Sequence, residues 1–205
     1  MGQNINILIL NDISRNILRF LKKNLSSLFK GNVTVSKHII IPSSLFNENK
    51  KQYDGRKLMK FLTENMTLKE ARDINLAVFD RDIYAGNLDY VFGLASPFPK
   101  IGVVSIMRMH PHYNEDYFSE GLKKRKAGKF PLLLRRLSGT EKKLYYERIL
   151  KEAVHIIGHA LGLIHCSNKD CIMYPSNSSG NIDSKDASFC GSCSKIIQTA
   201  AVNLK

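Results

Sequence analysis

Three histidines near the end of a predicted helix constrain the fold of this chain more than any other feature. His155 and His159 are four residues apart, so on a helix both stand on the same face and can reach one metal ion. Gly162 can adopt the left-handed conformation that ends a helix. The chain can then turn and bring His165 back toward the first two. Three neutral imidazoles in this arrangement can hold a tetrahedral zinc with a fourth position open to water.

The helix that carries the histidine pair is predicted to begin at a capping box, in which Ser138 and Glu141 satisfy each other's backbone donors. Upstream, hydrophobic periodicity predicts a β-α-β-α-β order followed by two more strands. The predicted strands are 5–10, 33–41, 75–79, 90–95 and 101–107, and the predicted helices are 14–29, 53–65 and, at the far end, 194–204.

All four cysteines lie in the last quarter of the chain, at Cys166, Cys171, Cys190 and Cys193. The last two form a C-x-x-C knuckle, and the first two provide a second pair of thiols. Four thiolates can enclose a closed tetrahedral zinc, and such a site is structural. An iron-sulfur cluster, a nucleic-acid zinc ribbon and four separately buried thiols are the open alternatives.

The string from His155 to His165 resembles the metzincin pattern H-E-x-x-H-x-x-G-x-x-H, with the three histidines and the glycine in their places. A narrower likeness follows the third histidine. The residues that continue the archaemetzincin pattern are Cys166, Cys171, Met173, Cys190 and Cys193. Weaker likeness at 80–84 and 91–95 extends the resemblance over most of the chain.

The resemblance implies an α+β metzincin fold in a single domain, 1–205, whose upper part is of α/β type. A twisted mixed sheet with flanking helices, a zinc helix, a Met-turn and a C-terminal helix are expected. The N-terminal subdomain would span about 1–162 and the C-terminal one, with the Met-turn and the cysteine site, about 163–205. Two zinc ions are implied, with Gly162 and Met173 as structural support for the first.

Ile156 stands where the family pattern has the glutamate that moves protons to and from zinc-bound water. A positioned acid-base group typically supplies about 10²–10⁴-fold in rate, and isoleucine cannot act as one. Glu152 is expected to be a solvated helix charge beside Arg148, with no rescuing role. The sequence therefore leaves three functions open: a weak or inactive zinc metallopeptidase, a pseudopeptidase that binds peptides or a protein partner, and a nucleic-acid-binding zinc protein. A peptide is expected to bind beside an edge strand within 102–107.

The formal net charge of +13 favours acidic partners, and part of it falls in a predicted loop between Lys123 and Lys129. That loop is expected to select acidic peptides, whereas nucleic acid is the weaker alternative because no recognised nucleic-acid module accompanies the charge. No secretory signal and no membrane-spanning apolar run are found. We therefore expect a cytoplasmic monomer without a membrane partner.

Overall fold

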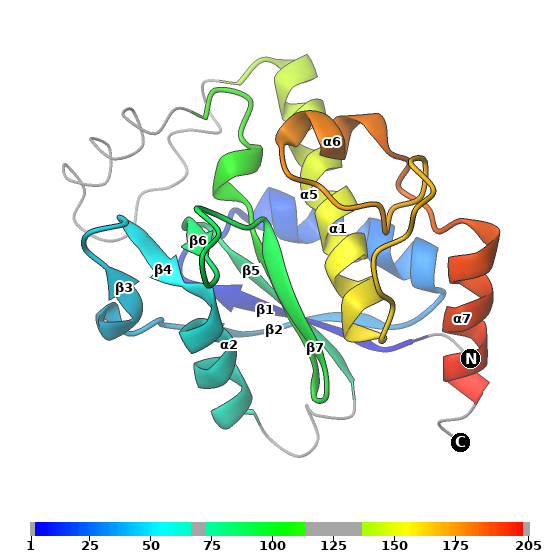
Figure 1. The fold of residues 1–205 in the computed structure, drawn as a ribbon, viewed down its shortest axis with the longest axis horizontal. Coiled ribbons are helices and arrows are strands. Elements are labelled where there is room, and N and C mark those ends of the chain that lie inside the picture. Colours follow the sequence, from blue (N-terminus) through cyan, green and yellow to red (C-terminus); the bar gives the residue numbers. More distant parts are fainter. Residues whose placement is uncertain (1–2, 67–72, 114–136, 203–205) are drawn as a thin grey trace.

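A five-stranded sheet forms the centre of the computed structural model, which describes residues 3–66, 73–113 and 137–202 (Figure 1). The basic segment 123–129, expected as a loop, lies outside these residues. The strand order is β2-β1-β5-β8-β7. The strands are β1 (Ile5–Leu10), β2 (Val33–Ile39), β5 (Ile74–Phe79), β7 (Gly93–Pro97) and β8 (Lys100–Ser105).

The first four strands of this order run parallel, and β7 joins β8 antiparallel at the edge. Parallel strands are covered on both faces, and accordingly every residue of β5 is buried. The expectation that 102–107 forms the edge is wrong, because β8 is paired with β5 on one side and β7 on the other. Within the described chain, the edge on this side of the sheet belongs to β7.

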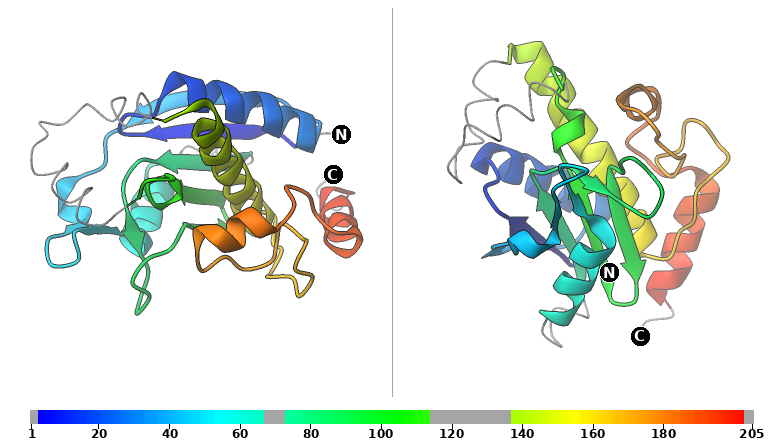
Figure 2. Two further views of the ribbon diagram at one scale, coloured as in Figure 1. Left: turned by 90° about the horizontal axis from the view of Figure 1, so that it is seen from above. Right: turned by 60° about the vertical axis from the view of Figure 1, so that its left-hand side comes forward.

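Helices cover both faces of the sheet (Figure 2). Helices α1 (Arg15–Phe29) and α5 (Gly139–Ala160) pack in one apolar core, and α2 (Gly55–Glu64) packs in the other. The alternation along β1 divides its side chains between them, with Ile7 in the first core and Leu8 in the second. These two layers fix the position of α5, which packs across β7 and β8.

The remaining elements lie around this framework. They are η1 (Ser43–Leu45), β3 (Phe46–Asn47), β4 (Gln52–Asp54), β6 (Ile83–Tyr84), η3 (Met107–Met109), α6 (Ser179–Ser184) and α7 (Gly191–Val202). Strands β3, β4 and β6 form a second, three-stranded sheet. No helix in the described part of the chain combines the length and apolar character that crossing a bilayer requires.

Helix α5 begins and ends where its sequence predicts. Ser138 and Glu141 form the capping box, with each side chain accepting a hydrogen bond from the other's backbone N–H. At the other end Gly162 has φ +90°, the left-handed conformation that a side chain disfavours. Leu163 N–H donates to Gly158 O at 3.0 Å, which closes the turn. The chain therefore leaves α5 abruptly and folds back beside it.

One buried carboxyl group marks the carboxyl end of β5. The side chain of Asp80 is inaccessible to solvent; one of its oxygens contacts Arg81, and the other, Oδ1, has no hydrogen-bond partner among the described residues. Burial raises the pKa of Asp80 to about 6, against an ordinary value of 3.8. Between these two pH values the folded protein holds a proton that the unfolded chain releases.

We expect Asp80 to lower the stability of the protein as the pH rises from 4 to 7. The unfolded carboxyl ionises first, so the free energy of unfolding should fall by up to about 3 kcal/mol across this range relative to Asp80→Asn. Urea unfolding of both proteins at a series of pH values measures the difference. Parallel stability curves for the two proteins would contradict this assignment.

Candidate metal centre and cleft

The three histidines predicted as ligands lie together at the end of α5. One ligand atom from each of His155, His159 and His165 can be chosen so that all three lie within 4.8 Å of one another. The Nε2 atoms of His155 and His159 are 3.0 Å apart. The ring of His165 lies 5.4 Å from that of His155 and 4.9 Å from that of His159, measured between centroids. The turn at Gly162 therefore brings the third imidazole back to the first two.

Backbone carbonyls orient the two helical imidazoles. His155 Nδ1–H donates to Ile172 O at 2.7 Å, and His159 Nδ1–H donates to Leu163 O at 2.7 Å. A hydrogen bond of this kind fixes the tautomer, so that the Nε2 lone pair is left for a metal. Burial also lowers the pKa of His155 to about 3, which keeps this ring neutral.

These distances fit a zinc ion. Two nitrogens at about 2.0–2.1 Å from a tetrahedral zinc lie about 3.3 Å from each other, close to the 3.0 Å between the two Nε2 atoms. The set of three imidazoles is the donor set of a catalytic type of site, in which a fourth position stays open. His165 is the exposed member, and His155 is the buried one.

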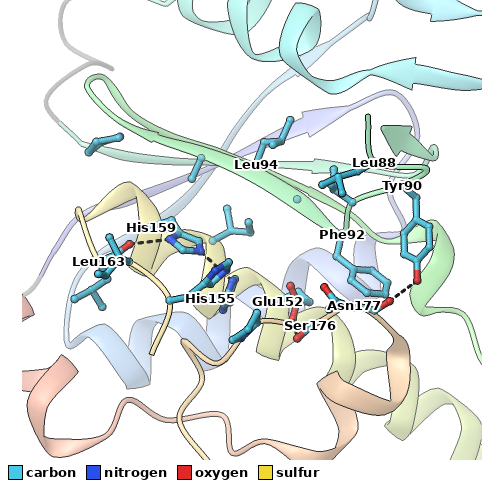
Figure 3. A pocket seen from close by; sticks show the side chains of 18 of the residues that line it. Leu88, Tyr90, Phe92, Leu94, Glu152, His155, His159, Leu163, Ser176 and Asn177 are labelled. Carbon is cyan, nitrogen blue, oxygen red and sulfur yellow. Dashed lines mark hydrogen bonds between the residues drawn. The ribbon is translucent and has the colours of Figure 1, made fainter. Parts of the chain in front are cut away.

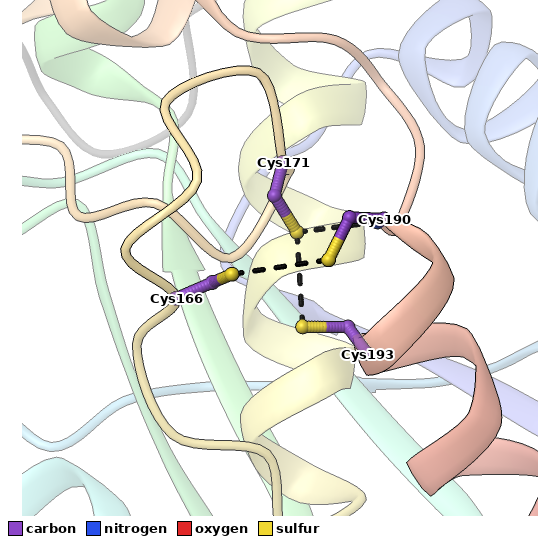
Figure 4. Close-up of side chains that lie close together, drawn as sticks. All are labelled: Cys166, Cys171, Cys190 and Cys193. Carbon is purple, nitrogen blue, oxygen red and sulfur yellow. Dashed lines mark hydrogen bonds between the residues drawn. The ribbon is translucent and has the colours of Figure 1, made fainter.

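The four cysteines also converge, between the chain that follows His165 and the start of α7 (Figure 4). The Cys166 and Cys190 sulfurs are 3.8 Å apart, as are those of Cys171 and Cys193. Four sulfurs at about 2.3 Å from a tetrahedral zinc lie about 3.8 Å from one another, so this spacing matches the metal and far exceeds a disulfide bond. The four thiols are free in the structure.

A cleft opens between the edge of the sheet and α5, with the histidines on its floor (Figure 3). The upper wall is formed by β7 and the segment before it, and the lower wall by α5 and Pro175 to Asn177. The described lining residues are mostly apolar. Asp89 and Glu152 are the carboxylates among them. The described lining residues include no lysine or arginine.

Ile156 fills a space that two glycines leave open in β7 and β8. A Cβ added to Gly93 would lie 2.6 Å from Ile156 Cδ1, and one added to Gly102 would lie 2.2 Å from its Cγ2. Ile156 is 3% exposed. The isoleucine that stands where the resemblance implies a glutamate is therefore packed against the sheet at the cleft wall.

Glu152 does not occupy the solvated position expected for it. Its side chain is buried and forms an ion pair with Lys185, with Glu152 Oε1 and Lys185 Nζ 3.1 Å apart. Ser176 Oγ–H donates to the same oxygen at 3.1 Å, and Lys185 Nζ–H donates to Tyr174 O at 3.1 Å. Arg148, the expected partner of Glu152, pairs with Asp183 instead. The pair thus ties α5 to the segment from Tyr174 to Ser176.

The direction in which Glu152 points could have been predicted from its position in the helix. Glu152 is three residues before His155 and four before Ile156, so all three lie on the same side of α5, which faces the cleft and the core. Nothing in the sequence pointed to Lys185, which lies 33 residues further along the chain. Its role follows from the fold alone.

Met173 packs against α5 at Gly158 and is not among the residues that line the cleft. It is fully buried, and a Cβ added to Gly158 would lie 2.4 Å from its sulfur. A glycine between the two helical histidines therefore lets the methionine approach α5 closely. Cys166 N–H donates to Met173 O at 3.0 Å, which connects this contact to the cysteine cluster.

Comparison with known proteins gives the family. A family model described as "Peptidase family M54" matches residues 117–199. An archaemetzincin from Methanocaldococcus jannaschii is 35% identical over 191 residues, which cover 93% of this chain and 90% of that protein. The chain belongs to the archaemetzincin family. The resemblance inferred from the sequence is confirmed, and zinc is the metal expected for an archaemetzincin.

Solved archaemetzincin structures share the fold. The structure from Methanopyrus kandleri has a TM-score of 0.74 at 25% identity and covers 98% of this chain and 96% of that one. The structure from Archaeoglobus fulgidus, complexed with malonate, has a TM-score of 0.71 at 28% identity and covers 95% and 99%. The mixed twisted sheet with flanking helices, predicted from the likeness, is thus confirmed as an archaemetzincin fold.

We expect Lys185→Met to destabilise this archaemetzincin by about 3–5 kcal/mol, because it leaves the Glu152 carboxylate buried without its partner. The double variant Glu152→Gln, Lys185→Met should recover much of that loss. Denaturant unfolding measures both effects.

Lys143→Met is the matched control, because Lys143 pairs with Glu147 on the surface of the same helix. Its expected cost is at most about 1 kcal/mol. If Lys185→Met lowers the free energy of unfolding by no more than Lys143→Met does, the buried pair does not hold the lower wall.

Proposed function

We propose that this archaemetzincin binds peptides in the cleft and hydrolyses them slowly, with a zinc ion held by His155, His159 and His165. The observation that carries the proposal is the convergence of three imidazoles on the floor of a cleft bounded by an edge strand. Zinc held there would supply an activated water and polarise the carbonyl of a bound peptide. The rate is expected to be slow because Ile156, which follows the ligand His155, cannot act as an acid-base group.

The edge of β7 is the surface that supports peptide binding. Within the described chain β7 pairs with β8 only, so the backbone groups on its other side can pair with an added strand. Gly93, Leu94 and Ala95 of this strand line the same cleft as the three histidines. An extended peptide bound there would pass its backbone over the metal site.

The chain offers no replacement for the missing acid-base group among the described residues of the cleft. Ile156 carries no group that can take or give a proton. Glu152 is buried in its pair with Lys185 and accepts from Ser176, and Asp89 is exposed in the segment before β7. Without a positioned base, a loss of about 10²–10⁴-fold in rate is expected.

A pseudopeptidase is the second candidate, and one observation favours it. The space left by Gly93 and Gly102 is filled by the isoleucine side chain, which is the contact of a well-packed apolar residue. Such a protein would keep the cleft for a peptide or protein partner without cleaving it. Selection of acidic partners by the segment 123–129 stays a prediction.

We further propose a structural zinc at Cys166, Cys171, Cys190 and Cys193, which would bring the total to two. The chain from 163 to 205 would then form the C-terminal subdomain, with Met173 as the Met-turn residue. The cysteine cluster supports this division because it joins the segment after His165 to α7. Metal binding at such a site contributes directly to folding.

Removing metal from the cysteine site is expected to cost stability. Chelator treatment should lower the unfolding temperature of the wild-type protein by several degrees or more, and Cys171→Ser should show a low unfolding temperature that the chelator barely changes. Scanning calorimetry measures this. His159→Ala is the control, because it should keep the chelator effect while losing one equivalent of zinc. A chelator effect of wild-type size in Cys171→Ser would rule out the structural zinc.

Restoring a carboxylate at position 156 tests the proposed activity. We expect Ile156→Glu to raise the turnover of an unstructured peptide by at least about tenfold over wild type, measured by mass spectrometry on zinc-loaded protein. Ile156→Gln has the same shape without the base and should give no gain. Equal turnover in wild type and Ile156→Glu would mean that this position does not limit the rate. If wild-type turnover does not exceed that of a sample without protein, and only Ile156→Glu cleaves the peptide, the pseudopeptidase is favoured.

A further inference from the structure

A tyrosine bridge spans the cleft beyond the Gly93 end of β7. Tyr90 Oη–H donates to Asn177 O at 2.5 Å, and both residues line the cleft. Tyr90 belongs to the upper wall and Asn177 to the lower one, so the hydrogen bond joins the two walls beyond Glu152 and His155 (Figure 3). An extended peptide that ran past the histidines on this side would meet the bridge.

The upper half of the bridge is held by a buried ion pair. Arg108 Nε donates to both oxygens of Asp82 at 2.8 Å, and its Nη2 lies 2.7 Å from Asp82 Oδ2. The guanidinium carbon of Arg108 lies 4.0 Å from the centre of the Tyr90 ring. A planar cation on the ring face fixes the orientation of the tyrosine. Tyr90 is therefore positioned from behind as well as through its hydroxyl.

The lower half of the bridge, at Asn177, is also held in place. Asn177 N–H donates to Asn181 Oδ1 at 3.2 Å, which attaches it to α6. The preceding residue, Ser176, donates to Glu152, whose partner Lys185 is fully buried. Opening the bridge would thus require movement of a segment that is tied to both α5 and α6.

The bridge lies a short distance from the metal site along the peptide path. Ile156 packs under Gly93 and Gly102, and its neighbour in the chain, His155, lines the same cleft as Gly93. Tyr90 is three residues before Gly93, in an irregular segment outside β7, and three residues of chain span at most about 10 Å. An extended peptide therefore has room for at most about three residues between the metal site and the bridge.

We propose that Tyr90 limits how far a bound peptide can extend past the metal site, so that the preferred ligand ends within about three residues on that side. The inference rests on the proposed function. Antiparallel pairing with β7, the slightly more stable arrangement, places the C-terminal part of the peptide toward Tyr90. The site thus favours the C-terminal end of a chain over its middle. The described lining residues include no lysine or arginine to bind the terminal carboxylate, so the limit is steric.

Two series of peptide hydroxamates on zinc-loaded protein test this proposal by titration calorimetry. In one series the hydroxamate precedes from one to six residues, which extend toward Tyr90. In the other series the same residues precede the hydroxamate and extend toward Pro97. We expect affinity in the first series to fall at least about tenfold beyond three residues, with no such fall in the second. Tyr90→Ala should abolish the fall, and Tyr90→Phe, which keeps the ring, should reduce it.

Tyr113→Ala is the matched control. The Tyr113 ring also lies over Arg108, 5.0 Å from its guanidinium carbon, but it is outside the cleft lining. This variant should keep the wild-type length limit. The proposal is overturned if up to six added residues raise affinity equally in both series in wild type, or if Tyr90→Ala keeps the limit. If short hydroxamates bind but added residues change affinity in neither series, the peptide site itself, and with it the proposed function, is refuted.

Discussion

The turn at Gly162 is the constraint on which the site depends, because it returns the chain to the helix that it has just left. The left-handed conformation at this glycine lets His165 approach His155 and His159 from outside the helix. Carbonyl oxygens of the returning chain then accept hydrogen bonds from the Nδ1–H groups of both helical imidazoles. The segment after Gly162 thus supplies the third imidazole and orients the other two. A site built from the helix alone would have neither.

Around this turn, three separate contacts hold the lower part of the molecule in place, and two of them reach α5. Met173 lies against Gly158, the Glu152 and Lys185 side chains form a buried ion pair, and the cysteine cluster holds the following segment to α7. A buried pair of charges is poor evidence for stability, but breaking it from one side is costly, so it specifies one arrangement. Together these contacts explain why the lower cleft wall keeps its place beside the histidines.

Local patterns predicted local structure well. The capping box at Ser138, the end of α5 at Gly162 and the gathering of histidines and cysteines all follow from residue types at short spacings. Two expectations failed because they depended on tertiary pairing. The order of strands cannot be read from periodicity, so β8 was expected at the edge that β7 occupies. Glu152 was expected in solvent because its partner Lys185 is distant in sequence and adjacent only in the fold. Tyr90 carried no sequence signal because its bridge also joins distant segments.

The proposed metal centre requires three imidazoles to bind the same cation. Crystals of the zinc-loaded protein, measured on both sides of the zinc absorption edge, test this directly. The account predicts an anomalous difference peak within about 2.0–2.1 Å of one nitrogen from each of His155, His159 and His165, and a second peak among the four sulfurs at about 2.3 Å. An anomalous map with density at the cysteines but none between the histidines would contradict it.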